Sequence, residues 1–328
     1  MNVLVLSYAD VVRLLPMAKC IELMAEAHRT TNDGRAVNPL RSVVWKPDRT
    51  GLLGLMPGFL AEPDSLGLKV VTIFPGNHGT SYDSHQGVVM LFDTAHGFPI
   101  AIIDASSITA IRTAAASGSA TRALAREDAS DLALLGAGVQ ARTHLEAMRA
   151  VRPIRRVRVW TRDRARAQRF AETSPVAVEI APSARAAVEG ADLICTVTAA
   201  REPILEGAWL RPGAHINAAG ACFAAARELD TAAVVRSRLF IDRRESTLAE
   251  SGDFLIPRAE GAIGDDHIVG EIGDVLLGRV PGRRSPDEIT LYKSLGIAIQ
   301  DLAAAHHIYA QATATGGGIL VPLGPDPA

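Results

Sequence analysis

The sequence has little cysteine and no long hydrophobic run. Its three cysteines in 328 residues are odd in number and far apart, which excludes a disulfide framework and a zinc-binding cysteine pattern: they are Cys20, Cys195 and Cys222. No apolar run approaches the roughly 18 residues that a membrane-spanning helix needs. The N-terminus also lacks the basic stretch and cleavage site of a secretory signal. These absences predict a cytoplasmic protein that contacts no membrane.

An excess of charge of one sign is also missing. The 34 Lys+Arg nearly balance the 36 Asp+Glu, so the formal net charge is −2 and no basic surplus exists to neutralise nucleic-acid phosphates. Only four of the basic residues are lysines, which leaves 34 − 4 = 30 arginines. A single arginine therefore carries little information here, whereas a lysine inside an apolar run stands out. The 48% hydrophobic content is typical of a folded protein and excludes general disorder.

The length predicts two domains. In the first third, apolar periodicity predicts a helix over residues 11–28, with Asp10 as its cap. Short strand-like runs follow, separated by glycine and proline, and they predict an antiparallel or strongly curved sheet. These runs cover residues 41–45, 51–56, 67–74, 87–92 and 99–104. A helix rich in small residues is then expected over residues 106–125.

From residue 131 the pattern changes to alternating strands and helices, which predicts an α/β fold with a doubly wound parallel sheet. The predicted strands are 132–135, 157–160, 176–180, 193–197, 215–218 and 239–241, and the predicted helices are 139–151, 164–173 and 183–189. A last helix is expected over residues 294–311. The tail from Gly316 is expected to be mobile.

One glycine-rich turn in this region predicts a dinucleotide site. The strand before residue 136 is followed by Gly136-Ala137-Gly138-Val139-Gln140 and then by a helix. In this context the first glycine permits a tight turn, and the second lets the backbone approach a pyrophosphate at the helix N-terminus. The other interpretation is a glycine turn in a Rossmann-like domain that binds no nucleotide.

The end of the next strand predicts which dinucleotide binds. An NAD site usually has an acidic residue there for the ribose hydroxyls, but this strand continues into Thr161 and Arg162, and Arg164 follows. Arginine suits a 2′-phosphate, which favours NADP(H) over NAD(H). Asp163 lies between the arginines and keeps NAD(H) open as an alternative.

Three cations lie in apolar or small-residue surroundings. Lys69 is inside an apolar strand, Arg112 is at the start of the small-residue helix, and Arg41 opens another strand. Buried cations need partners, because an unpaired buried charge costs several kcal/mol. The partner is either an internal carboxylate or an anionic substrate, and the residues alone leave both open.

Several runs along the chain resemble one family. GLLGLMPG, SHQGVVMLFD, ITAIRTAAAS, LLGAGVQA, PGAHINAAG and YKSLGIAIQDLAAA occur in the order typical of the ornithine cyclodeaminase/mu-crystallin family. The resemblance covers residues 1–311, and it is closest to the ketimine reductases of the mu-crystallin type. It implies a substrate-binding and dimerisation domain at 1–115, completed by 300–320, and a Rossmann domain at 116–299. It also implies a homodimer.

The resemblance assigns roles to named residues. Arg41, Lys69 and Arg112 would bind the α-carboxylate of a substrate, and the glycine turn from Gly136 to Gln140 would hold the pyrophosphate. The remaining cofactor contacts would come from Thr113, Thr161, Arg162, Thr196, Val197, Thr198 and Ser294. No metal site is expected.

One departure from the family bears on the reaction. Deaminating members carry an aspartate two residues after the glycine of the INAxG run, and here that position is Cys222. A neutral thiol does not hold an ammonium group as a carboxylate does. We therefore expect an NAD(P)H-dependent reductase of small imines or cyclic ketimines that bear a carboxylate. Lys69 is the first candidate for the proton donor, and His85 and Cys222 are weaker ones.

Two alternatives stay open at this point. One is an ornithine cyclodeaminase or an alanine-type amino-acid dehydrogenase that uses another proton donor. The second is a catalytically silent protein that binds a cofactor or a small ligand. The other histidines, among them His78, His96, His144, His306 and His307, are interpreted as structural or surface residues.

Overall fold

The computed structural model describes residues 1–77 and 80–324, and the chain divides into two compact units. One unit is Met1–Arg112 with Ile297–Ala328, and the other is Thr113–Gly296. The bounds expected from the sequence lie three residues further along the chain at both junctions. The first junction falls inside helix α3 (Ala105–Leu124). His78 lies outside the described residues.

The first unit contains an eight-stranded sheet in the order β16-β1-β7-β6-β5-β4-β2, with β3 paired to β4. Its strands are β1 (Asn2–Leu6), β2 (Ala36–Val37), β3 (Ser42–Trp45), β4 (Leu52–Ala61), β5 (Asp64–Ile73), β6 (His85–Phe92), β7 (Pro99–Asp104) and β16 (Ile319–Pro322). From β4 to β7 the neighbours are antiparallel, as the sequence predicts for this region. The strand β1 was not predicted.

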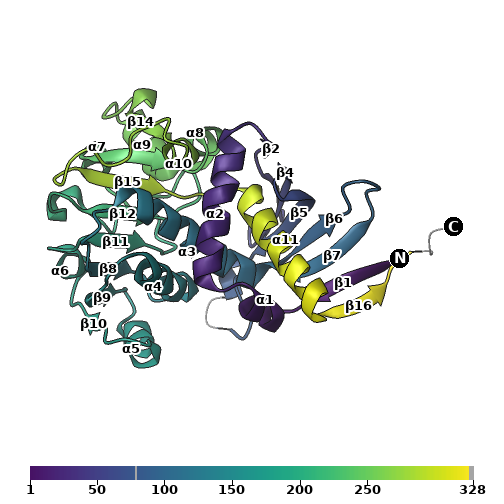
Figure 1. Ribbon diagram of the computed structural model, residues 1–328. Helices are drawn as coiled ribbons and strands as arrows, with labels where there is room; N and C mark the ends of the chain where they lie inside the picture. The colour runs from purple at the N-terminus through teal and green to yellow at the C-terminus, as the bar shows by residue number, and fades with distance from the viewer. Residues whose placement is uncertain (78–79, 325–328) are drawn as a thin grey trace. The chain divides into compact units, whose positions relative to one another are not determined.

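Three helices accompany this sheet: α1 (Tyr8–Leu14), α2 (Met17–Asn32) and α11 (Ala298–Thr315). In Figure 1, α2 and α11 lie side by side, although they come from opposite ends of the chain. The prediction of one helix over 11–28 was wrong, because Pro16 ends α1 and begins α2. The cap of α1 is Ser7, and Asp10 completes a capping box with it.

The tail is ordered as a strand as far as Pro322. β16 pairs with β1 in antiparallel register, from Asn2↔Pro322 to Val5↔Ile319. The expectation of a mobile tail from Gly316 was therefore wrong for this segment. Gly316 ends α11 in the left-handed conformation, with a φ of 74°, and lets the chain turn back toward β1.

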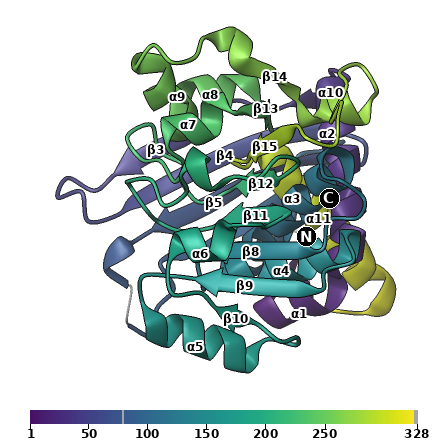
Figure 2. The same ribbon diagram turned by 90° about the vertical axis from the view of Figure 1, so that its left-hand side faces the viewer.

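The second unit contains an eight-stranded sheet in the order β10-β9-β8-β11-β12-β15-β13-β14. Its strands are β8 (Asp131–Leu135), β9 (Arg156–Trp160), β10 (Glu179–Ile180), β11 (Leu193–Thr196), β12 (His215–Ala218), β13 (Ser237–Ile241), β14 (Ile268–Glu271) and β15 (Ile289–Lys293). All neighbours are parallel (Figure 2). The predicted doubly wound sheet is confirmed, and β14 and β15 are strands that the prediction lacked.

Helices cover both faces of this sheet. They are α4 (Val139–Val151), α5 (Arg164–Thr173), α6 (Ala184–Val188), α7 (Thr231–Val235), α8 (Arg244–Glu250), α9 (Gly252–Ala259) and α10 (Ile272–Leu276). Figures 1 and 2 show α4 and α6 on opposite sides of β8 and β9. The core between these layers is mostly alanine, leucine, isoleucine and valine. No helix in the described parts of the chain is long and apolar enough to cross a membrane.

Candidate functional site

The glycine turn lies between β8 and α4, as the sequence predicts. Gly136 follows β8 with a φ of 125°, and a Cβ there would lie 2.8 Å from the carbonyl oxygen of Val197. Only glycine meets both demands without strain. Gly138 is the N-cap of α4, with no side-chain cap, and a Cβ there would meet nothing within 4 Å. The start of α4 therefore offers backbone N–H groups beside open space.

The turn also lies at the switch point of the sheet. β8 has β9 on one side and β11 on the other, so the strand order reverses around the carboxyl end of β8. Ligands of open α/β sheets bind at this point. Thr196 ends β11 there, and its buried Oγ1 has no hydrogen-bond partner among the described residues. The same holds for the buried hydroxyl of Ser294, just after β15.

Thr198 is held by a buried carboxylate. Glu228 Oε1 accepts hydrogen bonds from the Thr198 backbone N–H at 2.7 Å and from its hydroxyl at 2.6 Å, and Oε2 accepts one from the Gly220 N–H at 2.9 Å. The two loops that follow β11 and β12 are thus tied together. Burial and the nearby charge of Asp253 raise the pKa of Glu228.

The end of β9 shows what Asp163 does. It is the N-cap of α5, and its Oδ1 accepts hydrogen bonds from the backbone N–H groups of Ala165 at 3.0 Å and Arg166 at 3.3 Å. Arg162 and Arg164 are exposed, and neither has a side-chain partner within the described ranges. Thr161 is half-buried at the strand end.

In the first unit, two of the three predicted cations meet at a buried site. Lys69 is on the inward face of β5 and is 3% exposed, and Arg112 on α3 is 4% exposed. Arg41 lies directly before β3 rather than in it, and is half-buried. Its positive charge is close enough to lower the pKa of Lys69. The structure therefore brings Lys69 and Arg112 together, and Arg41 lies close enough for its charge to act on Lys69.

The site also contains a carboxylate that the prediction missed. Asp301 on α11 is fully buried, and its Oδ1 lies 3.1 Å from Lys69 Nζ and 2.9 Å from Arg112 Nε. It is the internal carboxylate that the sequence left open as a partner for the cations. The sequence contains only a weak signal that Asp301 is a partner of the cations, because it lies in an alanine-rich helix far along the chain from either of them.

Lys69 has an unusual environment for an ammonium group. Burial lowers the pKa of Lys69 to about 8, and Arg112 and Arg41 act in the same direction, whereas the charge of Asp301 opposes them. Nζ donates hydrogen bonds to Asp301 and, at 2.7 Å, to the hydroxyl of Thr109. Such a lysine is charged at neutral pH and gives up its proton more readily than a lysine in water.

The two weaker proton-donor candidates have surroundings of their own. His85 is exposed at the start of β6, with its Nδ1 3.0 Å from the hydroxyl of Ser84. Cys222 is half-buried in the second unit, in the loop after β12, and its Sγ lies 3.8 Å from the carbonyl oxygen of Ala219. Thr113, expected on the cofactor side, is half-buried on α3 directly after Arg112.

Lys293 forms a second buried ion pair, with Asp253. Nζ of Lys293 lies 2.9 Å from Asp253 Oδ2 and donates to the carbonyl of Ala221 at 2.5 Å. Asp253 Oδ1 accepts from the backbone N–H groups of Glu228 and Leu229. This pair fixes the loop that carries Cys222.

His144 has a structural role, as predicted. It is fully buried on α4, where Nδ1 lies 2.7 Å from the carbonyl of Gln140 and Nε2 lies 3.0 Å from Ser117 Oγ. Because a carbonyl only accepts, the proton is on Nδ1, and the serine donates to Nε2. His96 is exposed and pairs with Asp93, and His306 and His307 are half-buried on α11.

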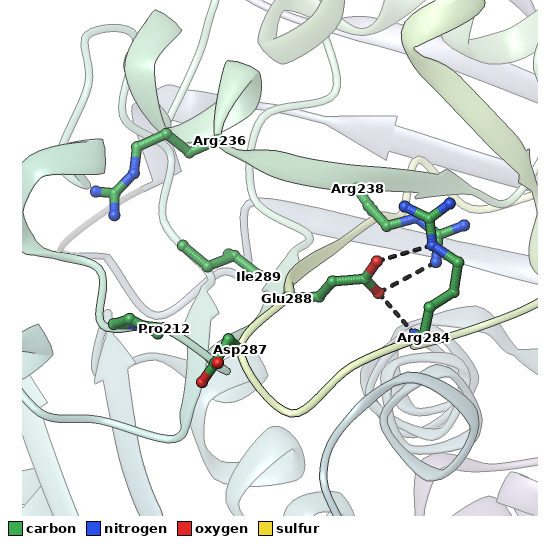
Figure 3. A pocket seen from close by; sticks show the side chains of 7 residues that line it. All are labelled: Pro212, Arg236, Arg238, Arg284, Asp287, Glu288 and Ile289. Carbon is green, nitrogen blue, oxygen red and sulfur yellow. Dashed lines mark hydrogen bonds and ion pairs between the residues drawn. The ribbon is translucent and has the colours of Figure 1, made fainter.

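A surface pocket of the second unit contains none of the predicted site residues. Its lining consists of Pro212, Arg236, Arg238, Arg284, Asp287, Glu288 and Ile289 (Figure 3). Arg238 and Arg284 both pair with Glu288 there. The pocket borders the first residues of β13 and β15, whereas the glycine turn follows the last residue of β8. Because the strands are parallel, the pocket lies at the amino ends of the strands and the glycine turn lies at their carboxyl ends.

Comparison with known proteins gives a consistent result. The sequence model of the ornithine cyclodeaminase/mu-crystallin family matches residues 1–316. The chain is 43% identical over 277 residues to ketimine reductase mu-crystallin of Mus musculus, covering 84% of this chain and 86% of that protein. It is 33% identical over 320 residues to a Δ1-pyrroline-2-carboxylate reductase of Bacillus cereus, covering 96% and 98%.

A solved structure agrees with these relatives. The Δ1-pyrroline-2-carboxylate reductase of Thermococcus litoralis, in complex with NADH and L-proline, superposes with a TM-score of 0.95. The two chains are 38% identical, and the match covers 97% of this chain and 100% of the other.

Proposed function

The chain belongs to the ornithine cyclodeaminase/mu-crystallin family, and from this premise we propose that it reduces small cyclic ketimines bearing a carboxylate on the imine carbon. It is an oxidoreductase that acts on C=N bonds. Substrates of the Δ1-pyrroline-2-carboxylate and Δ1-piperideine-2-carboxylate type fit this description. The observation that carries the proposal is the buried pair of Lys69 and Arg112, with the charge of Arg41 close to Lys69, in a chain that also has a dinucleotide-type glycine turn.

The cation cluster accounts for recognition of the substrate carboxylate. Lys69 and Arg112 share one internal carboxylate, Asp301, so these three side chains together carry a net positive charge. Nη2 of Arg112 has no partner among the residues that the structure describes. Of the three N–H groups of Lys69 Nζ, two donate to Asp301 and Thr109, and the third has no acceptor there. A substrate carboxylate would accept charge-assisted hydrogen bonds from Arg112, which fix its orientation, and the remaining N–H of Lys69 would face the imine nitrogen.

The second unit has the features that a dinucleotide needs. Gly136 brings the chain round tightly, Gly138 leaves open space where a pyrophosphate would approach, and the N-terminus of α4 has no side-chain cap to block its N–H groups. The buried hydroxyls of Thr196 and Ser294, which lack partners among the described residues, would hydrogen-bond the nicotinamide end. Thr113 and the segment Val197–Thr198 would line the same end.

Lys69 is the proposed proton donor. An imine accepts hydride far better once its nitrogen is protonated, so an acid must lie near that nitrogen. Lys69 Nζ would give its proton to the imine nitrogen, and with a pKa of about 8 it is charged at neutral pH. When bound, the reduced nicotinamide supplies the hydride to the imine carbon, which completes the amino acid.

We propose that NADPH is preferred over NADH. Asp163 is used as the cap of α5, while Arg162 and Arg164 are exposed and unpaired among the described residues. These two arginines and the hydroxyl of Thr161 would receive the 2′-phosphate. The Thermococcus litoralis relative was solved with NADH, so the preference is a property to be tested in this chain.

The remaining proposals concern assembly and location. We propose a homodimer, because the first unit exposes apolar side chains on β3 and β16: Val43, Val44 and Trp45, and Ile319 and Leu320. None of the three cysteines, all of which lie in the described residues, forms a disulfide, which suits a reducing cytoplasm. Light scattering after gel filtration measures the oligomeric state.

The first test follows NADPH and NADH oxidation with Δ1-pyrroline-2-carboxylate and Δ1-piperideine-2-carboxylate. We expect rapid turnover with a ketimine and none with L-ornithine or L-alanine and the oxidised cofactors. Lys69→Met should reduce kcat by about 100-fold or more, as loss of a general acid does. Lys19→Met replaces an exposed lysine on α2 and should leave the rate unchanged.

Formation of proline and ammonia from L-ornithine would contradict the proposal. It would show that Cys222 in place of the family aspartate still permits deamination. Full activity of Lys69→Met would remove Lys69 as the proton donor, and the same assay on His85→Gln and Cys222→Ala would then test the two weaker candidates.

A further inference from the structure

Two neighbouring residues of α11 contact the cations of the first unit. Asp301 Oδ1 accepts from Arg112 Nε and from Lys69 Nζ, and Gln300 Oε1 accepts from Arg112 Nη1 at 2.7 Å. Gln300 is itself oriented by His28, because its Nε2 lies 3.0 Å from His28 Nε2. An amide nitrogen only donates, so the amide oxygen must face the guanidinium. All of these groups are fully or almost fully buried.

The sheet is built to let α11 come this close. Gly58 on β4 and Gly67 on β5 are direct partners in the antiparallel register. A Cβ at Gly67 would lie 2.5 Å from Leu302 Cδ2, and a Cβ at Gly58 would lie 3.1 Å from Ile299 Cδ1. Both contacts come from the residues of α11 on either side of Gln300 and Asp301. The paired glycines therefore bring the first turn of the helix down onto β4 and β5, where Lys69 lies.

The first turn of α11 also favours a negative charge. Asp301 lies in that turn, where the positive end of the helix dipole stabilises a carboxylate. Its Oδ2 is buried without a hydrogen-bond partner in the described residues. Oδ1 alone accepts the hydrogen bonds from both cations, which fixes the distance between the lysine and the guanidinium.

We propose that Asp301 and Gln300 are positioning residues, which orient Arg112 so that its guanidinium faces the substrate carboxylate and Lys69 so that its free N–H faces the imine nitrogen. The inference deepens the proposed function and rests on it for the identity of the substrate. With the N–H of Nε and one N–H of Nη1 donated to α11, the N–H groups left for a ligand are both of Nη2 and the second of Nη1. Asp301 has a second task, which is to keep Lys69 charged.

The electrostatics around Lys69 give that second task a measurable effect. Arg112 from α3 and Arg41 from the segment before β3 lower the pKa of Lys69, as burial does, and Asp301 from α11 is the group that raises it. The two titratable neighbours from α2 are uncharged at neutral pH: burial raises the pKa of Cys20, and burial lowers the pKa of His28 to about 4. Without Asp301, the lysine would lose its proton at a lower pH.

The decisive variant is Asp301→Asn, which keeps the size and removes the charge. In the wild type, kcat/KM for the ketimine should fall as the pH rises through about 8, where Lys69 deprotonates. In Asp301→Asn this fall should move to lower pH by about 1 to 3 units, the usual effect of losing a close opposite charge. Asp128→Asn, at an exposed carboxylate, should leave the profile unchanged. A purely structural role would give a loss that is the same at every pH.

A second variant separates orientation from charge. Gln300→Leu removes one contact to Arg112 without changing any charge. We expect KM for the ketimine to rise by about 10-fold, the effect of losing one hydrogen bond to a charged group, with the alkaline fall still near 8. An unchanged KM would contradict the positioning role, and this variant keeps the proposal testable if Asp301→Asn does not fold.

A direct titration tests the inference without any activity. The chain has only four lysines, so protein labelled with ¹³C at lysine Cε gives four signals, and Lys69→Met identifies that of Lys69. The Lys69 midpoint should lie near 8 and fall in Asp301→Asn. An unmoved midpoint overturns the role of Asp301 even in an active enzyme. A shifted midpoint in a protein that reduces no ketimine supports that role and refutes the proposed function instead.

Discussion

At the scale of single residues, two arginines of the second unit differ from most others in the chain. Many of the arginines pair with an acidic neighbour, as Arg156 does with Glu179 and Arg158 with Asp131. Arg162 and Arg164 are exposed and have no such partner in the described parts of the chain. Unpaired guanidinium groups just after β9 are available to a phosphate that arrives with a ligand.

Arg162 and Arg164 should therefore determine the preference for NADPH over NADH. Replacing Arg162 and Arg164 together by alanine should raise KM for NADPH by about 10-fold or more, because a charge-assisted hydrogen bond contributes about 1.5–3 kcal/mol. KM for NADH should change little, because NADH has no 2′-phosphate. Steady-state kinetics with both cofactors measure the ratio. Arg166→Ala is the matched control, since Arg166 already pairs with Asp163. An equal change for the two cofactors would contradict the assignment.

The sequence could predict some site residues better than others. Lys69 was identifiable because a lysine is rare in this chain and lies in an apolar strand. Asp301 was not, because a single aspartate in a helix usually faces water, and only the approach of α11 to β5 shows that it is buried. Asp163 was ambiguous for a similar reason, since its role as a cap depends on side-chain geometry.

At the scale of elements, the two glycines of the turn between β8 and α4 have different roles. Gly136 is needed by the fold, with its positive φ and its contact to Val197, whereas Gly138 has ordinary backbone angles and open space beside it. The fold therefore tolerates a methyl group at Gly138. The same methyl group would clash with a ligand that lies close to the backbone there.

We expect Gly138→Ala to change the free energy of unfolding by no more than about 1 kcal/mol, the cost of a poorer cap. It should still weaken dinucleotide binding by about 10-fold, or about 1.4 kcal/mol. Gly136→Ala should instead lower stability by about 1–3 kcal/mol, because alanine is strained at that φ. Urea unfolding and titration of the bound cofactor's fluorescence measure both quantities. Unchanged affinity in Gly138→Ala would place the pyrophosphate elsewhere.

The elements themselves were predicted unevenly, for physical reasons. The helices α4 and α5 were predicted with their observed bounds, because the apolar spacing and the glycine and aspartate caps agree. The strand β15 was missed because it is short and carries buried polar residues, Thr290 and Lys293, whose partners lie on other elements. The strand β16 was missed because its pairing with β1 joins the two ends of the chain.

At the scale of the whole molecule, each unit has its own buried polar groups. Both units contain fully buried histidines: His28 lies in the first, and His144 and His215 lie in the second. Burial is the main cause that lowers the pKa of His28 and His144 to about 4 and that of His215 to about 3. Each of these imidazoles is therefore neutral in the folded chain near pH 7.

The last prediction concerns acid stability. These histidines have depressed pKa values in the folded state, so between pH 6.5 and about 3 the unfolded chain binds more protons than the folded one. The free energy of unfolding should therefore fall as the pH drops through this window, and the loss due to the histidines should be complete below it. His144→Gln removes one of these groups and should reduce the slope by about one proton, whereas His96→Gln, at an exposed histidine, should not. Urea unfolding at several pH values measures the slope, and an equal slope in His144→Gln and the wild type would show that His144 is not buried in its neutral form.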